Sequence, residues 1–194
     1  MKLEIKWADD NLKKFGTDIE RLQREFPKVL PRIVNQVGNR SKTQVIRNLA
    51  KQTGLPRKTV VKAIGDPSHA GVGKLSYEVV TGGGNIRLKY LNPRETRPGV
   101  VAKPFGEAKL FPHTFMLGGM FPDRHGGNFD GHVMRRLGYG DRTDGSIGEK
   151  LTQVRSGVFI PREMTRGATK AAFENTAAPL LQERVEAVLR KLFP

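Results

Sequence analysis

Four histidines are the residues best suited to metal chemistry, because neutral imidazole nitrogens are common zinc ligands. They are His69, His113, His125 and His132. None of their spacings forms HxH, HxxxH or HExxH, the patterns that bring two imidazoles to one side of a strand or helix. We therefore predict no metal site and no cofactor, and interpret the histidines as solvated or hydrogen-bonded side chains.

Residues of the types used in catalysis also lack a catalytic arrangement. Four aspartates lie in glycine-rich segments beside arginine or glycine, where Asx turns explain them: Asp123, Asp130, Asp141 and Asp144. Ser156-Gly157 lacks the glycine on its amino-terminal side that a nucleophile elbow needs. The glycines at 82–84 are not followed by Lys-Ser/Thr, so this segment is a turn and not a phosphate loop. The sequence predicts no catalytic residues and no enzyme.

The amino-acid composition indicates which kinds of partner and which kinds of site are compatible with the chain. The 194 residues hold 34 Lys and Arg against 19 Asp and Glu, a formal net charge of +15. Such a charge favours phosphate backbones or acidic protein surfaces as partners. The absence of cysteine excludes disulfides, Cys-zinc sites and thiol nucleophiles. No signal-peptide core and no apolar run of membrane-spanning length occurs, so we expect no membrane partner.

The strongest signal is a basic segment between Phe26 and Gly65 that contains no acidic residue. A helix normally offsets such a row of charges with glutamates one turn away. At 100° per residue, Arg40, Arg47 and Lys51 fall on one side of the predicted helix. The candidate contacts to DNA or an acidic partner are Arg32, Arg40, Lys42, Arg47, Lys51, Arg57, Lys58 and Lys62, with Lys28 as the ninth basic residue of the segment.

One interpretation of the basic segment is a helix-turn-helix that binds double-stranded DNA. Ala50, Gly54 and Val60 have the spacing of the small residue, the turn glycine and the apolar anchor of such motifs. Residues 56–59 would then lead a recognition helix into the major groove. The predicted first helix is longer than 20 residues, whereas such motifs use a short one.

Helical periodicity dominates both ends of the chain. Residues 3–7 alternate as a short strand, and residues 10–24 have one apolar helical face. Pro27 and Pro31 bracket the start of a second helix, with apolar residues at Leu30, Ile33, Val34, Val37, Val45 and Leu49. Gly54 is the expected stop, and a short helix follows over 56–64. The last predicted helix runs from Pro161 to Leu192, with a kink or break at Pro179.

The middle of the chain is strand-like. We predict a hairpin of 75–80 with 86–91, and further strands at 100–103, 111–117, 132–136 and 151–154. The glycine-rich segments 118–131 and 138–148 are predicted loops, at least one of them mobile until assembly, with plain surface loops as the alternative. The order of elements predicts one α+β domain with a central antiparallel sheet. Its parts are a helical basic arm (1–65), the sheet (72–160) and a carboxy-terminal helix (161–194).

Several segments together resemble the minor tail protein Z family of lambda-like bacteriophages. The amino-terminal helix of that family and its basic extension are similar to residues 34–38, continuing through Val45 to Thr53-Gly54 and 57–62. The strand pattern of the family is similar to that of residues 86–88, 99–101 and 111–115. The strand after its glycine-rich loop resembles residues 131–136, and the exit to its last helix resembles residues 157–161. The loops at 118–131 and 138–148 are longer and more acidic than the family pattern.

The resemblance implies a non-catalytic virion protein at the head-proximal end of the tail, needed for tail completion and head–tail joining. It implies synthesis in the bacterial host cytoplasm and partners among tail terminator, tail-tube or head-completion proteins. Sheet edges favour a homo-oligomeric ring, since ring closure removes them. Repeating the +15 charge around a ring requires an acidic partner, or non-specific contact with packaged double-stranded DNA.

Overall fold

The computed structural model describes residues 7–123, 127–141 and 147–192. The chain divides into two compact units, each built from separate stretches. Unit 1 comprises Met1–Gln44, Asp66–Val80 and Phe173–Pro194, and unit 2 comprises Val45–Gly65 and Thr81–Ala172. Two helices, α1 (Trp7–Thr53) and α4 (Gly167–Leu192), contribute to both units. The expected single domain stays a prediction.

Helix α1 is a single element of 47 residues with Pro27 and Pro31 inside it. The prediction of two helices separated at these prolines is therefore wrong. A proline removes only its own backbone donor, and burial of neighbouring side chains such as Ile33 and Val37 favours continuing the helix. Residues 3–6 of the predicted first strand lie outside the described residues, while Trp7 is already helical.

The predicted stop at Gly54 is confirmed. Its φ is +73°, and its N–H donates to the carbonyl of Ala50 at 3.0 Å, which closes the last turn of α1. The short helix that follows, α2 (Arg57–Ala63), is also confirmed, with Pro56 preceding its first residue.

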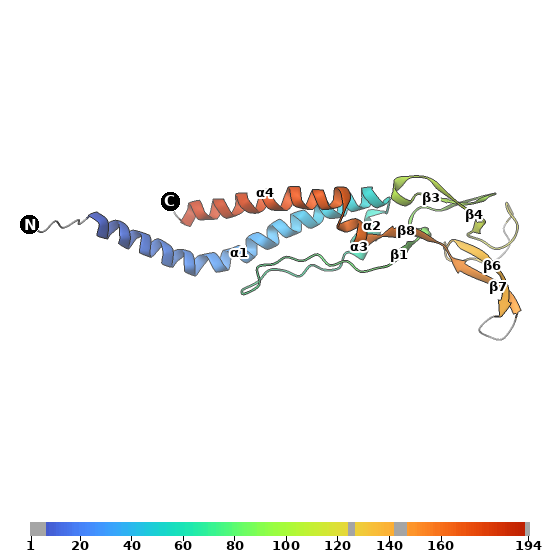
Figure 1. Ribbon diagram of the computed structural model, residues 1–194, viewed down its shortest axis with the longest axis horizontal. Helices are drawn as coiled ribbons and strands as arrows, with labels where there is room; N and C mark the ends of the chain where they lie inside the picture. The colour runs from blue at the N-terminus through green and yellow to red at the C-terminus, as the bar shows by residue number, and fades with distance from the viewer. Residues whose placement is uncertain (1–6, 124–126, 142–146, 193–194) are drawn as a thin grey trace, which may run out of the picture. The chain divides into compact units, whose positions relative to one another are not determined.

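Unit 1 contains two helical segments that run antiparallel, the unit 1 portions of α1 and α4, together with the hairpin at 66–80 (Figure 1). Bridges join Ser68 to Glu78 and Gly71 to Lys74, around a turn at Val72-Gly73. The Asn35 amide accepts from Ala70 N at 2.7 Å and donates to Ala70 O at 2.9 Å, which ties this hairpin to α1.

The predicted pairing of 75–80 with 86–91 is wrong. Residues 74–78 fold back on 68–71 instead, because Gly73 supplies a positive φ of +84° at a tighter turn. Within unit 2, β1 (Asn85–Arg87) pairs with β8 (Arg155–Phe159), and η1 (Leu88–Tyr90) is a 3-10 turn where a strand was expected. The glycines at 82–84 therefore form a connection and not a hairpin turn.

The described residues of unit 2 form three small antiparallel sheets, and the α+β class with antiparallel strands and a long carboxy-terminal helix is confirmed. The first sheet is β1 with β8. The second, in the order β2-β3-β4, comprises Arg94–Thr96, Gly99–Ala102 and Lys109–Pro112. The third, in the order β5-β6-β7, comprises Thr114–Phe115, Met134–Asp141 and Ile147–Gln153.

Strand boundaries differ from the prediction, most clearly at His113 and in the segment 138–148. The expected strand 111–117 is interrupted at His113, whose φ of +57° separates β4 from β5. The expected loop 138–148 belongs largely to the β6–β7 hairpin, since Gly140 pairs with Gly148; residues 142–146 lie outside the described residues. In the other predicted loop, 118–131, Gly118 N donates to Gly127 O at 3.1 Å, and residues 124–126 lie outside the described residues. Mobility of these loops stays a prediction.

The carboxy-terminal helix is interrupted at a different residue from the one expected. A short helix, α3 (Ile160–Met164), precedes α4, and the break falls at Thr165-Arg166 with Gly167 at a φ of +61°. Helix α4 continues through Pro179, so a break there is wrong. Pro179 and Asn175 are both exposed, so water solvates the carbonyl that loses its donor.

The core of unit 2 fixes the elements that carry its basic side chains. Leu49 and Val60 are fully buried, and so are Leu88 of η1, Val100 of β3 and Val158 of β8. Burial of one such side chain stabilises the fold by about 1.5–3 kcal/mol. These buried side chains therefore hold the last turns of α1, α2 and η1 against the core of unit 2. The lysines of these three elements point away from that core.

Candidate functional site

The predicted basic residues do not form one cluster. Arg32, Arg40 and Lys42 belong to unit 1, whereas Arg47, Lys51, Arg57, Lys58 and Lys62 belong to unit 2. All are exposed except Lys42, which is half-buried and has an interaction partner. The row formed by Arg40, Arg47 and Lys51 thus spans the boundary between the units, and unit 2 carries the larger group.

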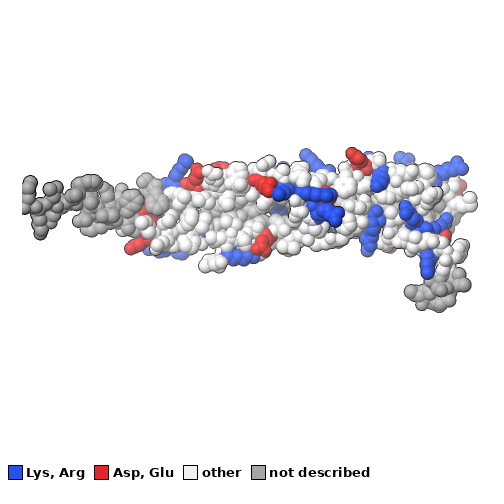
Figure 2. All heavy atoms as spheres, viewed as in Figure 1, with Lys and Arg blue, Asp and Glu red and all other residues white. Residues whose placement is uncertain are grey.

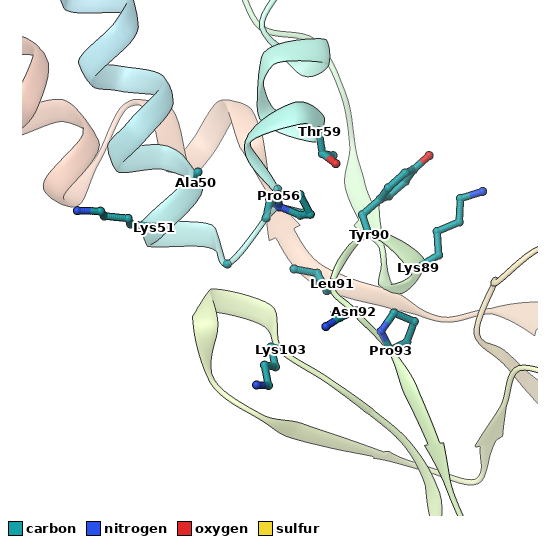
Figure 3. A pocket seen from close by; sticks show the side chains of 12 residues that line it. Ala50, Lys51, Pro56, Thr59, Lys89, Tyr90, Leu91, Asn92, Pro93 and Lys103 are labelled. Atoms are coloured by element: carbon teal, nitrogen blue, oxygen red, sulfur yellow. The ribbon is translucent and has the colours of Figure 1, made fainter.

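Unit 2 has a groove of about 750 Å³ lined by three lysines, Lys51, Lys89 and Lys103 (Figure 3). We call it the large groove. Lys51 comes from the last turn of α1, Lys89 from η1, and Lys103 from the residue after β3. The remaining lining residues carry no negative charge: Ala50, Gly54, Leu55, Pro56, Thr59, Tyr90, Leu91, Asn92 and Pro93.

A second groove of about 460 Å³, the small groove, is also basic and free of acidic residues. Lys58 and Lys62 of α2 line it, with Thr59, Ala63, Gly82, Gly83, Ile86 and Tyr90. Thr59 and Tyr90 line both grooves, so the two are neighbours that share a rim. The Tyr90 side chain in Figure 3 lies between Thr59 and Lys89.

Backbone contacts hold the walls of the large groove together. A Cβ at Gly54 would lie 2.5 Å from Gly106 N and 2.6 Å from Lys103 O, so only glycine allows the end of α1 to approach the segment after β3. Lys103 N in turn donates to Leu91 O at 3.2 Å, and Leu91 N to Leu88 O at 2.9 Å. For the small groove, Thr81 Oγ1 donates to Ala63 O at 3.0 Å.

Lys89 has two specific neighbours. Its Nζ lies 3.0 Å from Nε2 of His132 and 5.4 Å from the centroid of the Tyr90 ring. Burial lowers the pKa of His132 below its ordinary value, and the charges of Lys89 and Arg87 lower it further. A neutral His132 accepts a hydrogen bond from the Lys89 ammonium, which restricts the conformation of this lysine.

The positive charge of the two grooves is not neutralised within the described residues. No carboxylate there forms an ion pair with Lys51, Lys58, Lys62, Lys89 or Lys103. Lys and Arg side chains also recur on the face in Figure 2, with few Asp and Glu between them. The grooves therefore present ammonium groups to an anionic ligand.

Three lining residues were missed by the sequence analysis, namely Lys89, Tyr90 and Lys103. They lie outside the acid-free segment, and only the fold brings them beside Lys51 and α2. The feature of the sequence that could have identified them is the aromatic Tyr90 directly after Lys89. Conversely, Arg47 and Arg57 line neither groove.

The described residues offer no metal centre, since no three His, Asp or Glu side chains gather there in a way that would hold a metal ion. His69 contacts the Tyr77 ring edge-on at 5.5 Å, and His125 lies outside the description. Ser156 Oγ donates to Ile86 O at 2.8 Å and accepts from Val158 N at 3.1 Å, so this hydroxyl is hydrogen-bonded to backbone groups. Within the same residues, no helix has the length and apolar character needed to cross a membrane.

Comparison with known proteins gives no match for the chain among protein-family models, curated proteins or solved structures.

Proposed function

We propose that the chain is a structural subunit of a bacteriophage tail, which forms a homo-oligomeric ring at the head-proximal end and is needed for tail completion and head–tail joining. Its partners are copies of itself and the neighbouring tail terminator, tail-tube or head-completion proteins of the virion. It performs no catalysis. The family resemblance in the sequence supports this proposal, and the apolar surface of unit 2 is the structural observation that carries it.

This apolar surface lies on the β6–β7 hairpin and on the segment before β6. Tyr139 is 83% exposed, Leu137 65% and Met120 85%. Tyr139 pairs with Glu149, which shares a face of β7 with Leu151, so Tyr139 and Leu151 lie on the same face, which also carries the Arg136–Glu149 ion pair. Exposed apolar side chains of this size are candidate contacts for a neighbouring protein.

A strand edge accompanies the apolar side chains. β7 pairs with β6 and with no other strand in the described part of the chain. An unpaired edge offers backbone donors and acceptors to a neighbouring copy, and closing a ring satisfies every such edge. The edge and the exposed Leu137 and Tyr139 side chains favour self-association through this hairpin.

Size-exclusion chromatography with light scattering tests the proposal. The wild-type protein is expected as a closed oligomer, and the double variant Leu137→Lys/Tyr139→Lys as a monomer. Val72→Lys is the control, because Val72 is an exposed apolar residue in unit 1, away from the hairpin in sequence. A wild-type chain that stays monomeric at every concentration, and that captures neither tail-tube nor terminator protein in pull-downs, would disprove the proposal.

The helix-turn-helix hypothesis has its own structural support and its own test. Gly54 occupies the turn with a φ of +73°, and Val60 is fully buried in α2. Against it, α1 has 47 residues and α2 only 7. Sequence-specific recognition predicts a preferred duplex that survives competition at moderate salt, because base contacts do not depend on counterion release.

A further inference from the structure

We propose that the large and small grooves of unit 2 bind a single strand of nucleic acid, with its phosphates on the groove lysines and one base stacked on Tyr90. This inference goes beyond the tail-subunit proposal and does not depend on it. It uses no residue of the β6–β7 hairpin, and it adds Lys89, Tyr90 and Lys103, which the helix-turn-helix hypothesis does not require.

Charge is the first reason. Five lysines from four separate parts of unit 2 line the two grooves, and the lining contains no carboxylate. Four of them are exposed, so their ammonium groups are free to follow a flexible chain of phosphates. Phosphate binding by lysine releases counterions and makes affinity strongly dependent on salt.

Tyr90 is the second reason. It lines both grooves, its side chain is 40% exposed, and the Lys89 ammonium lies 5.4 Å from its ring centroid. An exposed aromatic ring flanked by cations is the arrangement on which single-stranded binding proteins stack bases. Thr59 and Asn92, which also line the large groove, add hydroxyl and amide groups that bind phosphate or base edges.

The same two features argue against other polyanions. In a duplex, the base faces are stacked inside the helix and have no access to Tyr90. An acidic peptide provides charge for the lysines but no flat ring for the tyrosine. The combination of groove lysines with a shared aromatic residue therefore fits an unpaired strand best.

Fluorescence anisotropy on the full chain provides the test, with a labelled oligothymidylate of about 20 nucleotides as the probe. Lys51→Glu/Lys103→Glu is expected to weaken binding at least tenfold, and the affinity of the wild type is expected to fall steeply between about 50 and 200 mM salt. Tyr90→Ala is expected to weaken binding about tenfold, whereas Tyr90→Phe keeps the ring and retains affinity.

The matched control is Arg97→Glu/Lys109→Glu, which changes the net charge equally at exposed residues outside both grooves. It is expected to weaken binding much less than the groove variant. Circular dichroism checks that each variant folds. Light scattering separates the two proposals, because groove variants should lose strand binding and still self-associate.

Three results would overturn the inference. One is a duplex that binds as tightly as the single strand at equal phosphate concentration. Another is displacement of the strand by polyglutamate at equal charge, which would identify the ligand as any acidic polymer. The third is an abasic strand that binds as tightly as oligothymidylate, since stacking on Tyr90 requires a base.

Discussion

The side chain of Gln52, in the last turn of α1, donates a hydrogen bond of 2.9 Å to Oε2 of Glu163 in α3. The same nitrogen lies 3.1 Å from the Glu163 carbonyl oxygen, and Gln52 Oε1 accepts from N and Oγ1 of Thr169 at 3.1 and 2.9 Å. Arg166 pairs with the other carboxylate oxygen. Gln52 therefore joins the end of α1 to the α3–α4 junction within unit 2.

Replacing Gln52 by alanine is expected to lower the free energy of unfolding by about 1–3 kcal/mol, because buried partners lose their hydrogen bonds. Urea denaturation measures this as a lower midpoint at unchanged slope. Gln182→Ala is the control, since Gln182 bonds only to Glu186 on the exposed surface, and a change within about 0.5 kcal/mol is expected. Equal effects of the two variants would contradict a structural role for Gln52.

Acidification is expected to destabilise the fold partly through Glu163. Burial raises the pKa of this carboxyl, but hydrogen bonds from Arg166 and Gln52 and the nearby positive charges outweigh burial and hold the pKa below its ordinary value. Glu163 thus contributes stability above its unfolded pKa of about 4.3, and the contribution is lost as pH falls through the folded pKa. Stability curves at several pH values should show a shallower acid decline for Glu163→Gln. An identical decline would exclude this linkage.

Alanine at Gly54 is expected to destabilise unit 2 more than alanine at Gly131. The two glycines have nearly the same φ, +73° and +71°, so both variants incur the strain of a left-handed residue, about 1–2 kcal/mol. Only at Gly54 would the new Cβ also meet backbone atoms, whereas nothing lies within 4 Å at Gly131. The difference between the two unfolding free energies measures the close approach to Lys103 and Gly106, and no difference would mean that the approach is unimportant.

Removing the buried hydroxyl groups of Ser41 and Thr53 is expected to have different effects on the free energy of unfolding. Ser41 is fully buried, and its Oγ has no hydrogen-bond partner among the described residues, so Ser41→Ala should leave stability unchanged or raise it by about 1 kcal/mol. Thr53 Oγ1 is equally buried and donates to Leu49 O at 2.6 Å, so Thr53→Val should lower stability by about 1 kcal/mol. Thermal melts of both variants test the pair, and a loss at Ser41 would reveal a partner for its hydroxyl.

The titration of His132 is expected to depend on Lys89. Its pKa is lowered by burial first, then by Lys89, Arg87 and Arg155, with Asp130 acting in the opposite direction. Lys89→Met removes one of these charges, so the pKa of His132 should rise, as measured by the pH dependence of its ring signals in NMR spectra. Lys109→Met serves as the control, because Lys109 lies beside Phe111 and should not alter His132. An unchanged pKa in Lys89→Met would place Lys89 away from His132 in solution.

Helix positions were predicted well where local signals agree, and poorly where they depend on distant contacts. Gly54 ended α1 as expected, because a glycine with positive φ closes a helix by itself. Pro27 and Pro31 were expected to bracket the start of a second helix and Pro179 to kink or break the last one, yet α1 and α4 continue through them. Propensity is a weak guide when packing along the rest of the helix is favourable.

Strand pairing was the least predictable feature. The glycines at 82–84 gave a stronger local turn signal than Val72-Gly73, yet the pairing follows the latter. β1 pairs with β8 about 70 residues later, and such a partner leaves no trace in local sequence periodicity. The grooves depend on the same long-range contacts, so Lys51, Lys58 and Lys62 were predicted from the sequence, whereas Lys89, Tyr90 and Lys103 were not.

Unit 1 is drawn from three stretches of the chain, and the last of them begins at Phe173. Within it, Phe173, Ala177 and Leu181 of α4 line a cavity together with Val34, Val37 and Ser41 of α1. Unit 1 therefore depends on contacts between residues that are far apart in the sequence, and such contacts form slowly during folding. For the same reason, no short contiguous fragment reproduces unit 1, and removing residues 173–192 would expose the α1 side chains at Val34, Val37 and Ser41.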